Sequence, residues 1–427
     1  MRKRRMQGHC GSRHGVRVMW NQGPIGTYLY CLWHCLGGHR SVSHHRCLVK
    51  GRVTVSKADE QCLTVERTER GGALEVLQDP RVLTLCVSSL ILLITVGWLG
   101  YLTQDEGRAG AAASLVERHN QYAALVGITA DEQAGQGVAV CIVDTGIDLT
   151  HPSLNHLSGS IQWFDAIDGR GSPYDDHGHG TAMAGILVSD EVFEGHAQGI
   201  DLLVAKALGA DGSSGDNTLA EAVRWCSQRG ADVISLSLGG ADNILPGVLT
   251  GDESEDAIEE ALDNGIIVVA AAGNDGGTSE GEDVAYPGSI ERVISVGGIH
   301  LDGTSWEKSN RGDNEADWFS FPPKLFARDD PHRKPEVVAP AVDVPILHGS
   351  NYGQANGTSA ATVFVTAGMA RLLQANPELQ HDGAQGGSDT IQDIKEWLKD
   401  SSTGIDGHDD ALGYGQLSVL ELLSSAP

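Results

Sequence analysis

The chain beyond residue 115 alternates between continuous apolar runs and segments with helical periodicity. Five apolar runs have the length of strands, at 137–144, 201–208, 232–238, 265–272 and 292–298. Apolar residues spaced as on one helix face predict helices at His179–Ser189, Thr218–Arg229, Glu253–Asp263 and Ser359–Ala375. Strands this apolar are buried on both faces of a parallel sheet. The pattern therefore predicts an α/β fold of three layers, with helices on both faces of a central, mostly parallel sheet.

One apolar segment does not fit this alternation. Val82–Leu102 contains 21 residues and no charge, and a helix of this length, about 31 Å, would cross a bilayer. A signal peptide cleaved near Ala113 and a buried globular helix are the alternatives. Basic residues predominate on the N-terminal side of the segment, so the positive-inside rule predicts that the following residues lie outside the cytoplasm.

These patterns predict four parts of the chain. Residues 1–81 form a basic segment without periodicity, either disordered or the result of a start site assigned too far upstream. Residues 82–102 are the transmembrane helix or signal anchor, and 103–114 a linker. Residues 115–427 form one α/β domain of a size that can bury a core.

Charge and cysteine are unevenly distributed. The chain has 30 basic and 57 acidic residues and a net charge of −27, and 14 of the basic residues lie before residue 82. Such an acidic domain excludes nucleic-acid binding, which needs basic patches, and is typical of proteins from salt-loving hosts. Only two of the eight cysteines, Cys141 and Cys226, lie in the domain. We expect no disulfide framework there and a buried free thiol at Cys141.

Three residues with complementary chemistry occur at strand ends or helix starts. Asp144 ends the first apolar run, His179 begins the next helical segment, and Ser359 begins the last. In an α/β fold, sites form at the carboxyl ends of the strands. A serine becomes a nucleophile when a histidine removes its proton and a carboxylate orients that histidine. Each residue alone is typical of a turn or helix cap, but the three together indicate a catalytic set.

Two further segments suit a site for peptide hydrolysis. Asn274 follows a buried strand and Gly273, where its amide could stabilise an oxyanion. Small residues at the end of another strand, Ser237 to Gly239 with Leu238 between them, leave room for an extended peptide to pair as an added strand. Asn274 alone would be read as a turn residue, because Asp-Gly-Gly follows it.

From Leu115 to the C-terminus the sequence resembles the subtilisin-like serine proteases, or subtilases. The resemblance rests on "VDTGID", "HGHGTAMAG", "SLSLGG", "AAAGND" and "NGTSAA", and extends to "YPGSIERVISVGG", "KPEVVAPAV" and "LGYGQLSV". It implies a subtilisin-like catalytic domain over residues 115–427. It also implies Asp144 as the orienting carboxylate, His179 as general base, Ser359 as nucleophile and Asn274 as oxyanion donor.

The family resemblance also concerns the substrate site. It implies that Ser237, Leu238 and Gly239 form a substrate-binding edge, and that Gly273, Asp275 and Ala285 line the pocket for the first side chain. For a pocket of this kind we predict broad endopeptidase specificity. The sequence departs from the family at Val363, where proline is usual. Slower turnover with an intact catalytic set is the expected consequence.

No cofactor is required for this chemistry. Asp190, Glu191 and Glu194 could hold a calcium ion, but a solvated acidic loop is the expected structure, so no metal is predicted. The function predicted is a monomeric serine endopeptidase acting on proteins or peptides, anchored in the membrane through residues 82–102 or secreted. The alternative is a catalytically weak or inactive protein that keeps the fold and binds peptides.

Overall fold

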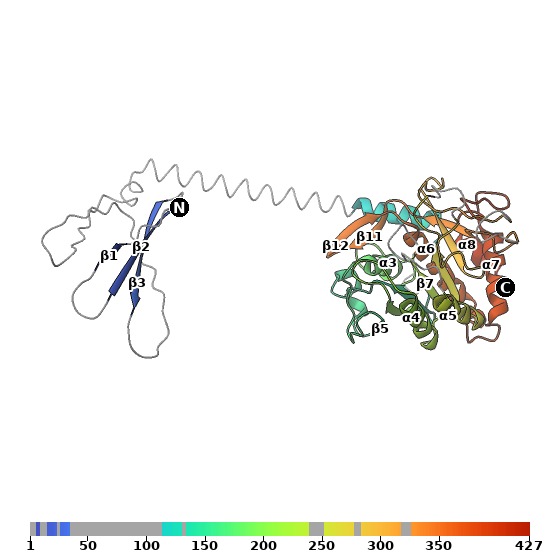
Figure 1. The fold of residues 1–427 in the computed structure, drawn as a ribbon. Coiled ribbons are helices and arrows are strands. Elements are labelled where there is room, and N and C mark those ends of the chain that lie inside the picture. Colours follow the sequence, from blue (N-terminus) through green and yellow to red (C-terminus); the bar gives the residue numbers. More distant parts are fainter. Residues whose placement is uncertain are drawn as a thin grey trace. The chain divides into compact units, whose positions relative to one another are not determined.

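The computed structural model describes residues 6–8, 15–23, 26–34, 113–129, 134–238, 252–276, 283–316 and 326–427. The chain divides into two compact units, Met1–Thr103 and Gln104–Pro427 (Figure 1). In the first unit, β1 (Met6–Gly8), β2 (Gly15–Gly23) and β3 (Gly26–His34) form a three-stranded antiparallel sheet. The predicted membrane segment 82–102 lies outside the described residues. Within the part of the chain that the structure describes, no helix is long and apolar enough to span a membrane.

The second unit is built on a seven-stranded sheet in which all pairs are parallel. Its order is β10-β9-β8-β7-β4-β6-β5. The strands are β4 (Ala139–Asp144), β5 (Gln162–Asp165), β6 (Asp201–Lys206), β7 (Val233–Leu236), β8 (Ile267–Ala271), β9 (Ile294–Ile299) and β10 (Val337–Pro340). All five predicted strands are present, and the prediction of a parallel sheet is confirmed. β5 and β6 lie on one side of β4, and β7 to β10 lie on the other, so the order in which strands are added reverses between β4 and β7. The carboxyl ends of these two strands are therefore the expected place for a site.

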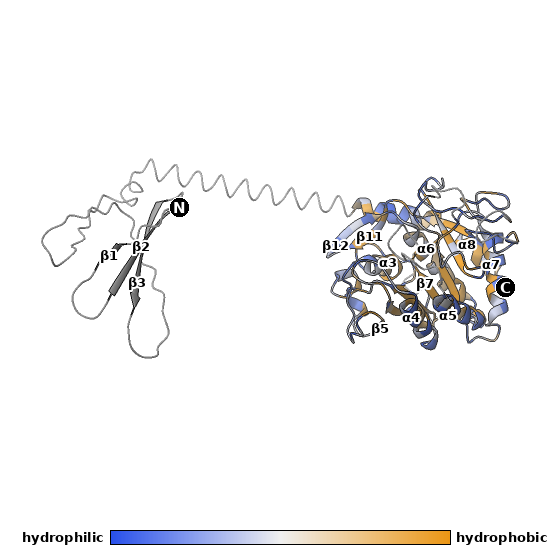
Figure 2. Cartoon of the chain, viewed as in Figure 1, coloured by the Kyte–Doolittle hydropathy of each residue, from blue (hydrophilic) through white to orange (hydrophobic). Residues whose placement is uncertain are grey.

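Helices cover the two faces of this sheet, as the apolar strands require. Helices α4 (Asp216–Gln228) and α5 (Asp252–Asp263) pack against each other, and α4 also packs against β4 and β6. Helices α3 (His179–Val188) and α6 (Thr358–Ala375) form a second packed pair, with α6 against β7 to β10. Apolar residues concentrate on the central strands and on α6, and polar residues on the outer helices (Figure 2). The three-layer α/β fold predicted from the sequence is confirmed.

The remaining described elements of the domain lie outside the central sheet. A hairpin of β11 (Val344–His348) and β12 (Asn351–Ala355) packs against α3. Helices α7 (Ser388–Ser401) and α8 (Val419–Ser425) pack against each other. Short 3-10 helices, η1 (Pro152–Leu157) and η2 (Pro377–Leu379), and a helix over residues 113–125 are also present.

The prediction of a free thiol at Cys141 is wrong. Cys141 in β4 and Cys226 in α4 form a disulfide, with their Cα atoms 5.9 Å apart. Leu219, Val223 and Cys226 share the buried face of α4, which packs on β4. The helix face therefore brings the second sulfur onto the strand, a juxtaposition that the count of two cysteines did not reveal.

Candidate functional site

Asp144 and His179 are in direct contact at the carboxyl end of β4. Nδ1 of His179 lies 2.8 and 2.9 Å from the two carboxylate oxygens of Asp144, to which it can donate. The carboxylate is fully buried and also accepts from the backbone N–H of Thr145 at 2.6 Å. About a third of the His179 side chain, 30%, remains exposed. A ring held by Nδ1 presents its other nitrogen, Nε2, as an acceptor.

The turn that delivers His179 is built around Asp175. Gly178 precedes α3 with a left-handed φ of 98° and offers no side chain to cap the helix. The Asp175 carboxylate takes that role, accepting from the N–H groups of Gly178 and Thr181 at 2.7 and 2.9 Å. Next to His179, Gly180 is required because a Cβ there would lie 2.2 Å from the carbonyl oxygen of Gly146. The helix start is therefore fixed against the end of β4.

The pKa of His179 is raised above its ordinary value of 6.5. Burial lowers it, but the negative charge of Asp144 and the hydrogen bond to that carboxylate raise it by more, with a further contribution from Asp175. An imidazolium formed at this position is thus stabilised by two carboxylates.

Ser359 is the second residue of α6 and is nearly buried. Its hydroxyl donates to the carbonyl oxygen of Ser237, just after β7, at 3.1 Å. Because the first four N–H groups of a helix lack intrahelical acceptors, the backbone N–H of Ser359 can serve a ligand. The positive end of the α6 dipole adds to its attraction for an anion. Val363 is the sixth residue of α6 and is buried, so it belongs to the second turn.

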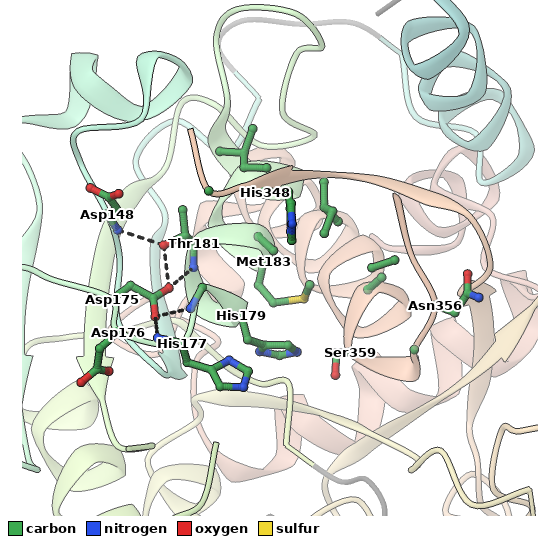
Figure 3. Close-up of a pocket in the computed structure, with 18 of the residues that line it drawn as sticks. Asp148, Asp175, Asp176, His177, His179, Thr181, Met183, His348, Asn356 and Ser359 are labelled. Carbon is green, nitrogen blue, oxygen red and sulfur yellow. Dashed lines mark hydrogen bonds between the residues drawn. The ribbon is translucent and has the colours of Figure 1, made fainter. Parts of the chain in front are cut away.

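One cavity of about 640 Å³ collects His179, Ser359 and Asn274. Figure 3 shows the side chains of His179 and Ser359 facing the same space, from α3 and α6. Met183 of α3 and the end of the β11–β12 hairpin, including Leu347 and His348, form further parts of its wall. These wall residues were not predicted as site residues, and "VPILHG" (344–349) carries no catalytic motif that would have indicated them.

Asn274 is anchored to the start of α6. Its Oδ1 accepts from the N–H of Thr358 at 2.8 Å and from the hydroxyl of that residue at 3.0 Å. With the oxygen held in this way, the amide nitrogen is the part of the side chain that can donate into the cavity. Asn274 and Ser359 are therefore positioned by the same helix start.

The predicted substrate-binding residues lie in two places, and none of the described ones lines the cavity of Figure 3. Ser237 and Leu238 are buried after β7, and Gly239 lies outside the described residues. Gly273 has a left-handed φ of 109°, and a Cβ on it would lie 3.0 Å from that of Ala285. The backbone N–H of Asp275 donates to Asn310 at 2.7 Å.

Among the described residues, one group of side chains has its ligand atoms close enough together to hold a metal ion. In the loop considered for calcium, Asp190 instead pairs with His156 at 3.1 Å. Ligand atoms of Asp232, His381 and Asp382 lie within 4.8 Å of one another. Both oxygens of Asp232 are already used, by the N–H of Ala139 and by His381 Nδ1 at 2.8 and 2.7 Å. These two hydrogen bonds account for the position of Asp232.

Comparison with known proteins identifies the fold and the family. Residues 135–415 match the model of the subtilase family. The chain is 33% identical over 300 residues to the serine protease AprX of Bacillus subtilis, covering 63% of this chain and 62% of that relative. It is 32% identical over 289 residues to subtilisin BL of Lederbergia lenta, covering 67% of this chain and 90% of that relative.

A solved structure supports the fold alone. The prenylagaramide maturation protease PagA aligns with a TM-score of 0.51 and 22% identity, over 69% of this chain and 95% of that chain. The family match extends from before β4 to just before α8 and includes Asp144, His179, Asn274 and Ser359. The chain belongs to the subtilase family of serine-type endopeptidases.

Proposed function

We propose that this chain hydrolyses peptide bonds with a catalytic triad of Asp144, His179 and Ser359. The observation that carries the proposal is the hydrogen bond of His179 Nδ1 to Asp144 on the wall of the cavity that Ser359 also lines. Membership of the subtilase family, whose curated relatives are serine proteases by name, supports the same reaction class.

The first step is activation of the serine. The hydroxyl of Ser359 turns from the carbonyl of Ser237 toward Nε2 of His179. As Ser359 Oγ attacks the scissile carbonyl, its proton passes to Nε2, and Asp144 stabilises the imidazolium without being protonated itself. His179 then gives the proton to the leaving amine, and the acyl-enzyme remains on Ser359.

The second step is hydrolysis of the acyl-enzyme. A water molecule loses its proton to His179 and attacks the ester, and the returning proton releases Ser359. In both steps the carbonyl oxygen becomes negative. The backbone N–H of Ser359 at the start of α6 and the amide of Asn274 are the donors proposed for it, supported by the contacts of Asn274 to Thr358.

The substrate and location are part of the proposal. Protein or peptide substrates follow from the family, and neither a cofactor nor a nucleic acid is needed. The disulfide between Cys141 and Cys226 favours an oxidising compartment outside the cytoplasm. We propose residues 82–102 as the membrane anchor or signal. Detergent-dependent extraction of the full chain would support an anchor, and a mature N-terminus near residue 113 would support cleavage instead.

Activity is tested by replacing the nucleophile. The full chain, Ser359→Ala and the control Ser424→Ala, which changes an exposed serine of α8, are assayed on an internally quenched peptide in high salt. We expect Ser359→Ala to lose a factor of at least about 10⁴ in kcat, and the control to match the parent. If the parent is as inert as Ser359→Ala but still binds peptide, the chain is the inactive binding protein.

A further inference from the structure

Two buried histidines, neither of which lines the cavity of the proposed triad, stack on each other in the core. His119 lies in the helix over residues 113–125, and His196 lies between α3 and β6. Their rings are parallel, with centroids 4.5 Å apart. Only 7% of His119 and 2% of His196 is exposed. Two titratable rings have thus been removed from water together.

Aromatic rings enclose this pair on both sides. Phe193 stacks on His119 with centroids 5.1 Å apart, and Phe364 of α6 packs on His196 at 4.7 Å. Nε2 of His196 is buried and has no hydrogen-bond partner among the described residues. A proton added to Nε2 would bury a positive charge and an N–H donor for which no described residue offers a hydrogen-bond acceptor.

The charged group facing the pair makes protonation still less favourable. Arg371 of α6 donates through Nε to the carbonyl oxygen of His196 at 2.9 Å, so a cation already lies beside the rings. A hydrogen bond with the backbone of Glu194 raises the pKa of His119, but by less than burial lowers it. Among the described residues, no carboxylate side chain contributes to the pKa of these two rings in a way that would stabilise an imidazolium.

Both histidines therefore titrate below the ordinary value of 6.5. Burial lowers the pKa of His119 to about 4, and burial, His119 and Arg371 together lower that of His196. The folded chain then binds protons more weakly than the unfolded one. The stabilisation from the neutral pair is complete above about pH 6.5 and is lost as the pH falls toward about 4.

Other contacts also hold the helix over residues 113–125: Arg118 pairs with Asp343 at 3.9 Å, and the side-chain amide of Gln416 donates to the carbonyl oxygen of Leu125 at 2.7 Å. Tyr122 packs its ring edge-on against Phe364 and hydrogen-bonds to the carbonyl oxygen of Val342. Just after the helix, the carbonyl oxygen of Val126 accepts from the N–H of Val419 at 2.8 Å. Most other positions of this helix are partly or fully exposed. Because so few of the described positions of this helix are buried, we expect it to open before the rest of the domain does.

We propose that the stack of His119 on His196 is an acid-sensitive latch, in which protonation separates the helix over residues 113–125 from α6 while the rest of the domain stays folded. Phe364 connects the latch to the helix that carries Ser359. Acid would therefore release the helix over residues 113–125 and also remove part of the packing against α6. The latch does not depend on the proposed catalysis, because it is measured in a variant without the nucleophile.

The test is hydrogen–deuterium exchange of full-length Ser359→Ala, at constant high salt, from about pH 7.5 to about pH 4. Rates are corrected for the pH dependence of intrinsic exchange. We expect residues 113–125 to lose protection by at least about tenfold below pH 6, with α7 as the protected internal reference. His196→Phe keeps an aromatic ring and loses the charge, so its transition should move at least about one pH unit lower. His300→Phe, at a partly exposed histidine, is the matched control and should not move it.

Two results would overturn the latch. Helix 113–125 could remain protected at about pH 4 in the Ser359→Ala parent, or His196→Phe could open at the same pH as that parent. Should His196→Phe fail to fold, the histidine Cε1 proton resonances of the parent decide. Two signals that titrate only below about pH 5 support the latch, whereas titration of every histidine near 6.5 contradicts it.

Discussion

At the scale of single residues, the site depends on side chains whose orientation is fixed by one neighbour each. Asp144 holds His179 through Nδ1, and Thr358 holds Asn274 through Oδ1. Each contact uses one end of a side chain and directs the other end to the cavity. This division allows the proposed role of a group in catalysis to be tested apart from its role in the fold.

Asn274→Asp tests the oxyanion donor. Aspartate retains Oδ1 as acceptor for both contacts with Thr358 but replaces the donating amide by a carboxylate. We expect kcat to fall by a factor of about 10²–10³, the magnitude known from subtilisin, with little change in KM. Steady-state kinetics and the melting temperature are measured together. A variant with unchanged Tm and unchanged kcat would exclude Asn274 from the oxyanion site.

The pH profile tests the general base. His179 must be neutral to accept a proton. The carboxylate of Asp144 keeps the pKa of His179 above 6.5 in spite of the burial of the ring. Activity is therefore lost as the pH falls through a value higher than 6.5. The acid limb of kcat/KM, which reports the free enzyme, is the measurement. A midpoint below 6.5 would mean that burial outweighs the carboxylate.

At the scale of elements, the sequence predicted those with strong periodicity and missed those without it. The five long apolar strands are correct, and the four predicted helices are present with shifts of one or two residues at their ends. β5 and β10, of four residues each, were not predicted. β7 is equally short, but it lies within a longer apolar run of the sequence, 232–238. The wall formed by the β11–β12 hairpin depends on tertiary packing against α3, which no local pattern records.

The disulfide is the element-scale feature with the clearest consequence. It joins β4, which ends in Asp144, to α4 across 85 residues of chain. Replacing both Cys141 and Cys226 by alanine should lower the free energy of unfolding by about 2–4 kcal/mol. Urea unfolding of the two proteins measures this. Peptide mapping without reductant provides the control, and recovery of Cys141 and Cys226 as separate thiols would contradict the crosslink.

At the scale of the whole molecule, excess negative charge is the dominant property. The net charge is −27, and α5 alone carries exposed Glu253, Glu255, Asp256, Glu260 and Asp263. Self-repulsion of this kind weakens as ions screen it. The urea midpoint should therefore rise between about 0.1 M and about 3 M KCl. A midpoint that stays constant or falls would remove the argument for a salt-loving host.

Covalent capture tests whether Ser359 is a nucleophile activated by His179. The full chain is treated with a fluorophosphonate, which reacts with activated serines and needs no knowledge of the substrate, and is then digested and mapped by mass spectrometry. We expect one phosphonylated peptide, modified at Ser359, and its loss in His179→Ala. If Ser359 is left unlabelled, or is labelled equally in His179→Ala, then His179 does not activate this serine as a nucleophile.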